Sequence, residues 1–560
     1  MNTCRHASHR PGIGISVLFI SLACFVEPVA RNYSLGATDD GTTPATKAAS
    51  ASANSSLDAT SLARRIDELL AASWAAEKVE PAPAADDAEF LRRVYLDLAG
   101  KIPSVGEARA FLDDANPEKR RVLVEHLLGR ATYQAHVGRT LRDLMLPGAS
   151  ANIQLQFLNT QFDAWLRLRL ADNVPYDQLV RDVLTYAPSG PINVRGSQNL
   201  NEPSPAAFYQ FNEQKPENLA ASTARLFLGV QLECAQCHHH PFAKWKREEF
   251  WSLAAFFGTT NLRGPGNAVT SLTDGNDRRG IQIPGTSTTV PPRLLGGTDP
   301  DWQPGESTRG RLARWVTSAE NPYFARAAAN RLWAHFFGRG LVDPVDDLDE
   351  SNPPSHPAAL DELTRQFVYH EFDLKYLVRT ITATRAYQLS SQTTHASQDE
   401  PTHFARMPLR SMTAEQLFDS LAQATGYEEQ NPGGRAGFAV ALNSPRGMFL
   451  TKYADSGPTR TEYQASILQA LTLMNGQIVA DATSIRRSET LQAIVEAPFF
   501  DTPKRIEALF LATLSRRPNS EELAKMQAHV DRAASPERQN LALADIFWAL
   551  LNSAEFVLNH

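Results

Sequence analysis

Apolar residues recur along most of the chain at intervals of three and four, the spacing of helices that bury one face. The first such segment is residues 57–77, and the next helix carries Phe90, Leu91, Val94, Tyr95 and Leu98. Asp86 and Asp87 can cap this second helix and Gly100 can end it. Further helices are expected at residues 118–128, 133–145, 153–170, 176–184, 216–232 and 246–257. The pattern resumes near residue 309 and continues to residue 557, with a Gly/Pro-rich break at 431–457. It therefore predicts a mainly α fold.

One segment departs from this pattern. Residues 259–306 are dense in Gly, Pro, Thr and Asn, with strand-like pieces at 281–283 and 288–290. We expect an irregular Gly/Pro-rich segment with a few short strands, which joins two helical domains. The predicted organisation is a signal peptide or N-terminal anchor (1–30), a disordered linker (31–56), a first helical domain (57–258), the irregular segment (259–306) and a second helical domain (307–560).

The N-terminus has the form of a secretory signal. Arg5 and Arg10 precede an apolar run at residues 13–26, which is short for a membrane span. No other comparable apolar run follows it. We therefore expect an extracytoplasmic protein, periplasmic or on the cell surface, with a membrane tether through the N-terminus as the one membrane contact that the sequence allows.

Composition narrows the function classes. Of 560 residues, 42% are hydrophobic and 21% are charged, as in ordinary globular proteins. The formal net charge is −7 and the mean hydropathy is −0.32. The charge argues against a nucleic-acid partner, and the hydropathy argues against a polytopic membrane protein. Motifs of common hydrolases, zinc proteases, nucleotidases and dehydrogenases do not occur, and the sequence leaves open whether the protein is an enzyme.

The strongest chemical signal is a cysteine motif. The chain has four cysteines, and removal of a signal peptide would leave Cys234 and Cys237. They stand in Cys234-Ala235-Gln236-Cys237-His238, the C-x-x-C-H pattern of c-type haem attachment. Two thiols three positions apart on one helical face can form thioethers to a haem, and His238 can bind its iron. A single motif allows one haem c at most.

Two other interpretations of the motif stay open. Cys234, Cys237, His238 and His240 offer four nitrogen and sulfur ligands for Zn or another transition metal, and His239 is a further candidate. Alternatively, a Cys234–Cys237 disulfide stiffens a turn. For a haem, the opposite axial position has no assigned ligand.

Candidates for that opposite ligand lie in the first helical domain. They are His126, His136 and Met145, each of which also suits an ordinary helix position.

The second half contains an acidic segment. Its acids fall within eight residues: Asp343, Asp346, Asp347, Asp349 and Glu350. Such oxygen-rich segments can bind hard cations, but Pro344 interrupts this one and EF-hand spacing is absent. We favour a solvated acidic loop that caps a helix or pairs with Arg326, Arg331 or Arg339, with His356 just beyond it.

Several stretches carry a family resemblance. In the first half they are residues 90–98, Gly100-Lys101-Ile102-Pro103 and residues 229–245, which resemble the planctomycete cytochrome-c-like (PSCyt) domain. In the second half they are residues 321–326, 330–333, 336–342, 346–347, 352–357, 385–388 and 559–560, which resemble its usual companion, a planctomycete-specific (PSD) domain of unknown function. One departure is His239, where the family tends to carry an acid or amide. The resemblance implies an exported protein with a cytochrome-like domain.

Three functional hypotheses follow. The first is an exported c-type haem protein that transfers electrons, or gives redox support, to an unknown redox or surface protein partner. The second is an extracytoplasmic metal-dependent enzyme or binding protein, related to polysaccharide, with the Cys/His cluster as its metal site. The third is a structural or interaction scaffold.

Overall fold

Helices dominate the first part of the computed structural model, as the spacing of apolar residues predicts. The structure describes residues 56–148, 156–187, 203–258, 261–262, 272–273, 280–428, 444–453 and 477–560, so the predicted signal peptide and linker lie outside it. The helices of this part are α2 (Ala59–Glu77), α3 (Asp87–Leu98), α4 (Val105–Asp113), α5 (Lys119–Leu128), α6 (Ala131–Met145), α7 (Gln156–Ala171), α8 (Tyr176–Thr185), α9 (Ala206–Phe211), α10 (Pro216–Thr223), a π-helix η3 (Ala224–Leu228), 3₁₀ turns η4 (Glu233–Gln236) and η5 (Ala255–Phe257), and α11 (Arg247–Ala254).

The second part is also helical. Its helices are α12 (Thr308–Val316), α13 (Phe324–Phe337), α14 (Pro357–Tyr369), α15 (Leu374–Ala383), 3₁₀ turns η7 (Ala396–Gln398) and η8 (Pro401–His403), α16 (Ala414–Thr425), α18 (Pro445–Tyr453), α20 (Gln477–Ala482), α21 (Glu489–Glu496), α22 (Thr502–Leu514), α23 (Ser520–Asp531), α24 (Pro536–Leu551) and α25 (Ala554–Val557). Among the described residues, none of the helices combines the length and the apolar run that a membrane crossing requires. The predicted mainly α fold is confirmed.

The strands are short and antiparallel. They pair as β1 (Asn261–Leu262) with β2 (Leu272–Thr273), β3 (Ile281–Gln282) with β4 (Thr289–Val290), and β5 (Arg410–Ser411) with β6 (Leu558–Asn559). In the last pair Arg410 faces Asn559. The strand-like pieces predicted at 281–283 and 288–290 therefore form one hairpin, whereas β5–β6 joins segments that no local pattern relates.

Two helix predictions were wrong in their limits. The helix expected at 216–232 ends at Leu228, because Gly229 adopts a left-handed conformation with φ +66° and its amide bonds to the Ala224 carbonyl. The break predicted at 431–457 contains α18, whose Phe449 and Tyr453 are buried. The cap of α3 is confirmed, since the Asp86 side chain accepts from the Glu89 amide.

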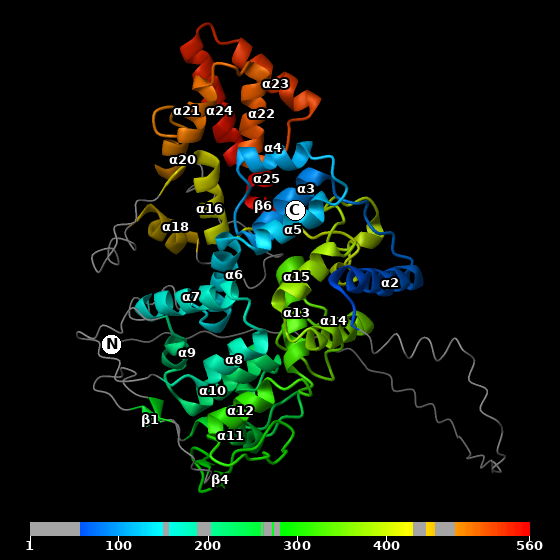
Figure 1. Ribbon diagram of the computed structural model, residues 1–560, viewed down its shortest axis with the longest axis vertical. Coiled ribbons are helices and arrows are strands. Elements are labelled where there is room, and N and C mark those ends of the chain that lie inside the picture. The colour runs from blue at the N-terminus through cyan, green and yellow to red at the C-terminus, as the bar shows by residue number, and fades with distance from the viewer. Residues whose placement is uncertain are drawn as a thin grey trace, which may run out of the picture. The chain divides into compact units, whose positions relative to one another are not determined.

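The hydrophobic core divides near residue 410. One cluster draws on both predicted helical domains, from Leu62 to Met407, with Leu511. Accordingly α2 packs on α14 and α15, and these helices lie together in Figure 1. A second cluster joins the C-terminal helices α16 and α21–α24 with Leu96 and Ile102. The helices on either side of the irregular segment therefore share one core, while the domain limits stay a prediction.

Helix α3 is buried on every side. Its buried residues include Arg92, Arg93 and Asp97, each fully shielded from solvent. The Asp97 carboxylate accepts hydrogen bonds from Arg410, Tyr387 and Asn559. Charged side chains are rarely fully buried unless they are paired. This helix therefore ties the first half of the chain to β5 and β6.

The pH dependence of the free energy of unfolding tests the burial of Asp67 on α2. Its carboxylate accepts the Arg385 amide at 2.8 Å, and burial raises the pKa of Asp67 from 3.8 to about 6. The folded state therefore binds more protons than the unfolded state between pH 3.8 and about 6, and this group's stability contribution is lost as pH rises through that window. We expect Asp67→Asn to raise the free energy of unfolding at pH 7 by about 1 kcal/mol, after allowance for solvent screening.

Urea unfolding of both proteins at a series of pH values measures this effect. The two curves should converge below pH 4. A difference between the variant and the parent that is the same at pH 4 and pH 7 would contradict the assignment.

Candidate functional site

The cysteine motif lies on an exposed turn whose inner side contacts buried residues. Residues 229–245 are here called the cysteine loop, and the motif begins on the 3₁₀ turn η4. Ala235, between the two cysteines, is fully buried and its amide bonds to the Leu232 carbonyl at 2.9 Å. The Gln236 carbonyl accepts from Trp251 Nε1 at 3.0 Å. These contacts anchor the turn and leave its outer side to solvent.

Both thiols of the motif are free and exposed. Cys234 and Cys237 are not joined to each other, so the predicted alternative of a disulfide is not formed in this structure. His238 and His239 are exposed as well, and the Phe242 side chain is 90% exposed. The motif is therefore open to a reagent or a partner molecule.

The three consecutive histidines differ in their tautomers. His238 Nδ1 lies 2.7 Å from the His239 carbonyl oxygen, which can only accept, so Nδ1 carries the hydrogen and Nε2 carries the lone pair of the neutral ring. His240 Nδ1 instead accepts from the Ala243 amide at 2.8 Å, and His239 Nδ1 accepts from the Arg247 amide at 3.1 Å. Their neutral rings therefore carry the hydrogen on Nε2. Only His238 of these three presents Nε2 as a metal ligand.

The orientation of the His240 ring does not suit the predicted four-ligand metal site. His240 is turned toward backbone amides of its own loop, and its Nε2 carries a hydrogen in the neutral ring. In the part of the chain that the structure describes, no group of three or more His, Cys, Asp or Glu side chains is placed to hold a metal ion.

The proposed opposite ligands of a haem occupy helix positions. His136 and Met145 on α6 are buried, and the His136 ring packs against His335 at 5.9 Å. His126 lies exposed in the last turn of α5.

The acidic segment packs against the cysteine loop. Residues 343–354 are here called the acidic loop. The Leu348 amide donates to the Gly229 carbonyl at 2.8 Å, Gln231 Nε2 donates to Asp346 at 3.0 Å, and Lys244 Nζ bonds to Glu350 at 2.8 Å. Sequence analysis singled out both segments and missed their contact, because no local pattern relates residues more than 100 positions apart.

Two arginines also contact the acidic loop, and Arg225 Nη1 lies 4.0 Å from Asp346. Arg339 pairs with Asp343 at 3.1 Å, which confirms one of the three predicted pairings. Arg326 instead pairs with Asp361, and Arg331 donates to the Arg225 carbonyl. Burial, with Asp349 and Asp346 nearby, raises the pKa of Asp347. His356 is satisfied elsewhere, against the Thr402 carbonyl at 3.0 Å.

A cavity of about 370 Å³ lies where the two loops meet. Its walls combine aromatic and proline rings with ion-paired side chains. They include Trp245, Tyr323, Pro353, Pro354, Lys244 and Arg326. The cavity is therefore a candidate ligand-binding pocket beside the cysteine loop.

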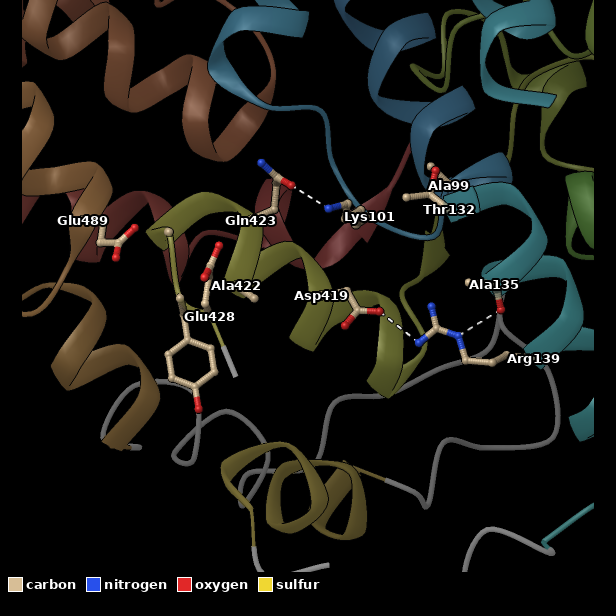
Figure 2. A pocket seen from close by; sticks show the side chains of 12 residues that line it. Ala99, Lys101, Thr132, Ala135, Arg139, Asp419, Ala422, Gln423, Glu428 and Glu489 are labelled. Atoms are coloured by element: carbon tan, nitrogen blue, oxygen red, sulfur yellow. Dashed lines mark hydrogen bonds and ion pairs between the residues drawn. The ribbon is translucent and has the colours of Figure 1, made fainter. Parts of the chain in front are cut away.

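A second, more polar cavity lies between α6, α16 and α21. Its volume is about 450 Å³, and Figure 2 shows Lys101 bonded to Gln423 and Arg139 bonded to Asp419 on its walls. Glu428 and Glu489 also line it. Lys101 belongs to the Gly100-Lys101-Ile102-Pro103 stretch that sequence analysis singled out. Arg139 already pairs with Asp419, and the mixed lining of the cavity selects no single class of ligand.

Gly229 is the point at which the two loops meet, and it supplies a test of their contact. A Cβ atom at Gly229 would lie 2.9 Å from Leu348 Cδ1, and its φ of +66° is strained for any other residue. We expect Gly229→Ala to lower the free energy of unfolding by about 1–3 kcal/mol and to speed proteolysis within the acidic loop.

Gly106→Ala is the matched control. A Cβ at Gly106 would have no atom within 4 Å, and the residue lies inside α4, where alanine is favoured. Thermal unfolding and limited proteolysis should separate the two variants. Equal proteolysis of the acidic loop in both would refute the role given to Gly229.

Comparisons with known proteins agree with the resemblance. Residues 65–262 match the family model PSCyt2, described as a protein of unknown function (DUF1549), and residues 308–457 match PSD1, described as a protein of unknown function (DUF1553). The predicted order of the two families is confirmed. No match came from the curated proteins or from the solved structures. The cysteine loop lies within the first matched region and the acidic loop within the second. The contact between the two loops therefore connects the two matched regions of the chain.

Proposed function

We propose that this chain, which carries a PSCyt2 domain followed by a PSD1 domain, is an exported c-type haem protein. Cys234 and Cys237 would hold one haem through thioether bonds, formed as each thiol adds to a vinyl group, and His238 Nε2 would bind its iron. The observation that carries this proposal is the 2.7 Å distance between His238 Nδ1 and the His239 carbonyl oxygen, which assigns the ring hydrogen to Nδ1 and leaves Nε2 to bind metal.

The donor set of the loop fits such a group. Both thiols are free and exposed, on a turn whose base is fixed by Ala235 and Trp251. A bound haem supplies one-electron redox chemistry. The chain's own residues hold the two sulfur atoms three positions apart and set the orientation of the His238 ring.

Electron exchange with a partner protein is the role that we assign to the site. Phe242 and the motif itself are exposed, which lets another protein approach closely. Redox encounters commonly use small contact areas, so one exposed loop is sufficient for a transient complex. The N-terminal pattern of Arg5, Arg10 and the apolar run at 13–26 supports an extracytoplasmic location, where c-type attachment takes place.

The test is production of the full chain in a host that matures c-type haem. We expect the denatured protein to gain the mass of one haem and the reduced protein to show a c-type absorption spectrum. Cys234→Ala combined with Cys237→Ala should abolish the covalent gain. Absence of haem on the parent chain, under conditions that mature a control cytochrome, would overturn the proposal.

Two single variants test the axial ligand. His238→Gln should keep the covalent haem and change its absorption spectrum, because the thioethers remain and the ligand is lost. His240→Gln is the matched control, since the glutamine oxygen can still accept the loop amides that His240 Nδ1 accepts. A spectrum that changes with His240→Gln and not with His238→Gln would reject His238 as the ligand.

A further inference from the structure

A cavity apart from the cysteine loop lies among helices of both matched regions. Its volume is about 90 Å³, and it is lined by residues of α3, α6, α13 and α15 and by Tyr176 at the start of α8. Most of its walls are aliphatic. They include Leu98, Val137, Leu141, Leu144, Leu332 and Val378. Ligand sites are usually apolar hollows of this kind with a few polar groups that orient the ligand.

Two tyrosines bring unsatisfied hydroxyl groups to this cavity. Tyr133 is 1% exposed and Tyr176 is 5% exposed, and both line the cavity. Tyr176 stacks on Phe324, and Lys375 lies over the Tyr133 ring, but no described residue forms a hydrogen bond with either hydroxyl. Neither hydroxyl oxygen is fully shielded, so both are free to donate a hydrogen bond to a group held in the cavity.

Arg331 adds a positive charge to the same wall. Its Nη2 donates to the Arg225 carbonyl at 3.1 Å, and its Nε is shielded from solvent without a hydrogen-bond partner. Among the described residues it makes no ion pair with a carboxylate. Burial lowers the pKa of Arg331 yet leaves it a cation, because arginine titrates far above neutral pH.

The cavity has donors and few free acceptors. Burial raises the pKa of Tyr176 to about 12, and it raises that of Tyr133 further, so both phenols keep their hydrogens. Asp97 also lines the cavity, but its carboxylate already accepts from Arg410, Tyr387 and Asn559. A negatively charged hydrogen-bond acceptor would therefore satisfy the donors that line the cavity.

We propose that this cavity binds a short-chain aliphatic monocarboxylate. Its carboxylate accepts from the hydroxyls of Tyr133 and Tyr176 and faces the Arg331 guanidinium, while its alkyl chain contacts the leucines. The small volume limits the chain to a few carbons. The rival occupant is water, since this volume is roughly the share of three water molecules in the liquid.

Titration of the full chain with butyrate, followed by calorimetry or ligand-observed NMR, tests the proposal. We expect saturable binding of butyrate and weaker binding of butyramide, its uncharged isostere. Tyr133→Phe combined with Tyr176→Phe should weaken butyrate binding by about tenfold or more, because both rings stay and only the donors are lost. Tyr369→Phe, at an exposed position of α14, should leave binding unchanged.

Three results would overturn the proposal. They are no saturable butyrate binding, equal affinity for butyrate and butyramide, and butyrate affinity that the double variant leaves unchanged. The first of these would leave water as the occupant. Haem attachment is not involved in the measurement, so its outcome is separate from that of the cysteine-loop experiment.

Discussion

Replacing Asp97 by alanine is expected to lower the free energy of unfolding by about 3–5 kcal/mol, because a buried guanidinium loses its counter-charge. Asp97 and Arg410 are both fully buried and lie 2.9 Å apart. The same carboxylate accepts from Tyr387 at 2.9 Å and from Asn559 at 2.8 Å. The loss therefore leaves three donors from distant segments without an acceptor.

Comparison with a surface pair gives this prediction its control. Arg65 and Glu68 lie 3.1 Å apart with about half of each side chain exposed, and Glu68→Ala should cost less than about 1 kcal/mol. A combined Asp97→Leu and Arg410→Met variant should recover part of the loss, since it removes both buried charges. Urea unfolding followed by circular dichroism measures all three variants. Equal midpoints for Asp97→Ala and Glu68→Ala would contradict the assigned role.

Arg92→Met is expected to cost about 3 kcal/mol or more and to release the segment at 555–558. The Arg92 side chain is fully buried and donates to the carbonyls of Phe556 at 2.6 Å, Glu555 at 3.1 Å and Thr513 at 3.0 Å. Hydrogen bonds to a charged group contribute about 1.5–3 kcal/mol each, and the carbonyls left behind are shielded from water. Methionine fills similar space without donors.

Hydrogen–deuterium exchange locates this effect. Peptides that cover residues 553–560 should exchange faster in Arg92→Met, while those of α2 stay protected. Arg517→Met is the control, because Arg517 is 44% exposed and pairs with Asp113 at the surface. Exchange at 553–560 that is no faster in Arg92→Met than in Arg517→Met would refute the role of Arg92.

Helix α3 shows that the spacing of apolar residues does not predict which charged residues are buried. The apolar positions Phe90, Leu91, Val94 and Leu98 predicted one buried face, and that face is buried. Arg92 and Asp97 lay outside the pattern, and charged residues are usually exposed. Their burial depends on carbonyls and donors from β5, β6 and α25, which are more than 300 residues away in the chain.

The histidines of the cysteine loop make the same point for the candidate site. Sequence spacing offered His238 as the haem ligand and added His240 only for a four-ligand metal site with Cys234 and Cys237. The loop then brings a carbonyl to Nδ1 of His238 and amides to Nδ1 of His240, which gives them opposite tautomers. The different hydrogen bonding of the two rings is therefore set by backbone groups that a motif does not encode.

Local sequence was enough to predict what depends on neighbouring residues: the helices set by apolar spacing, a cap at Asp86 or Asp87, the strand-like pieces at 281–283 and 288–290, and the order of Cys234, Cys237 and His238. Tertiary structure alone decided the contact of the cysteine loop with the acidic loop, the buried Asp97 cluster and the cavity lined by Tyr133 and Tyr176. The difference lies in the distance along the chain over which each interaction acts. Helix periodicity and capping act over a few residues, whereas the pairing of a buried polar group depends on which distant segments the folded core brings together.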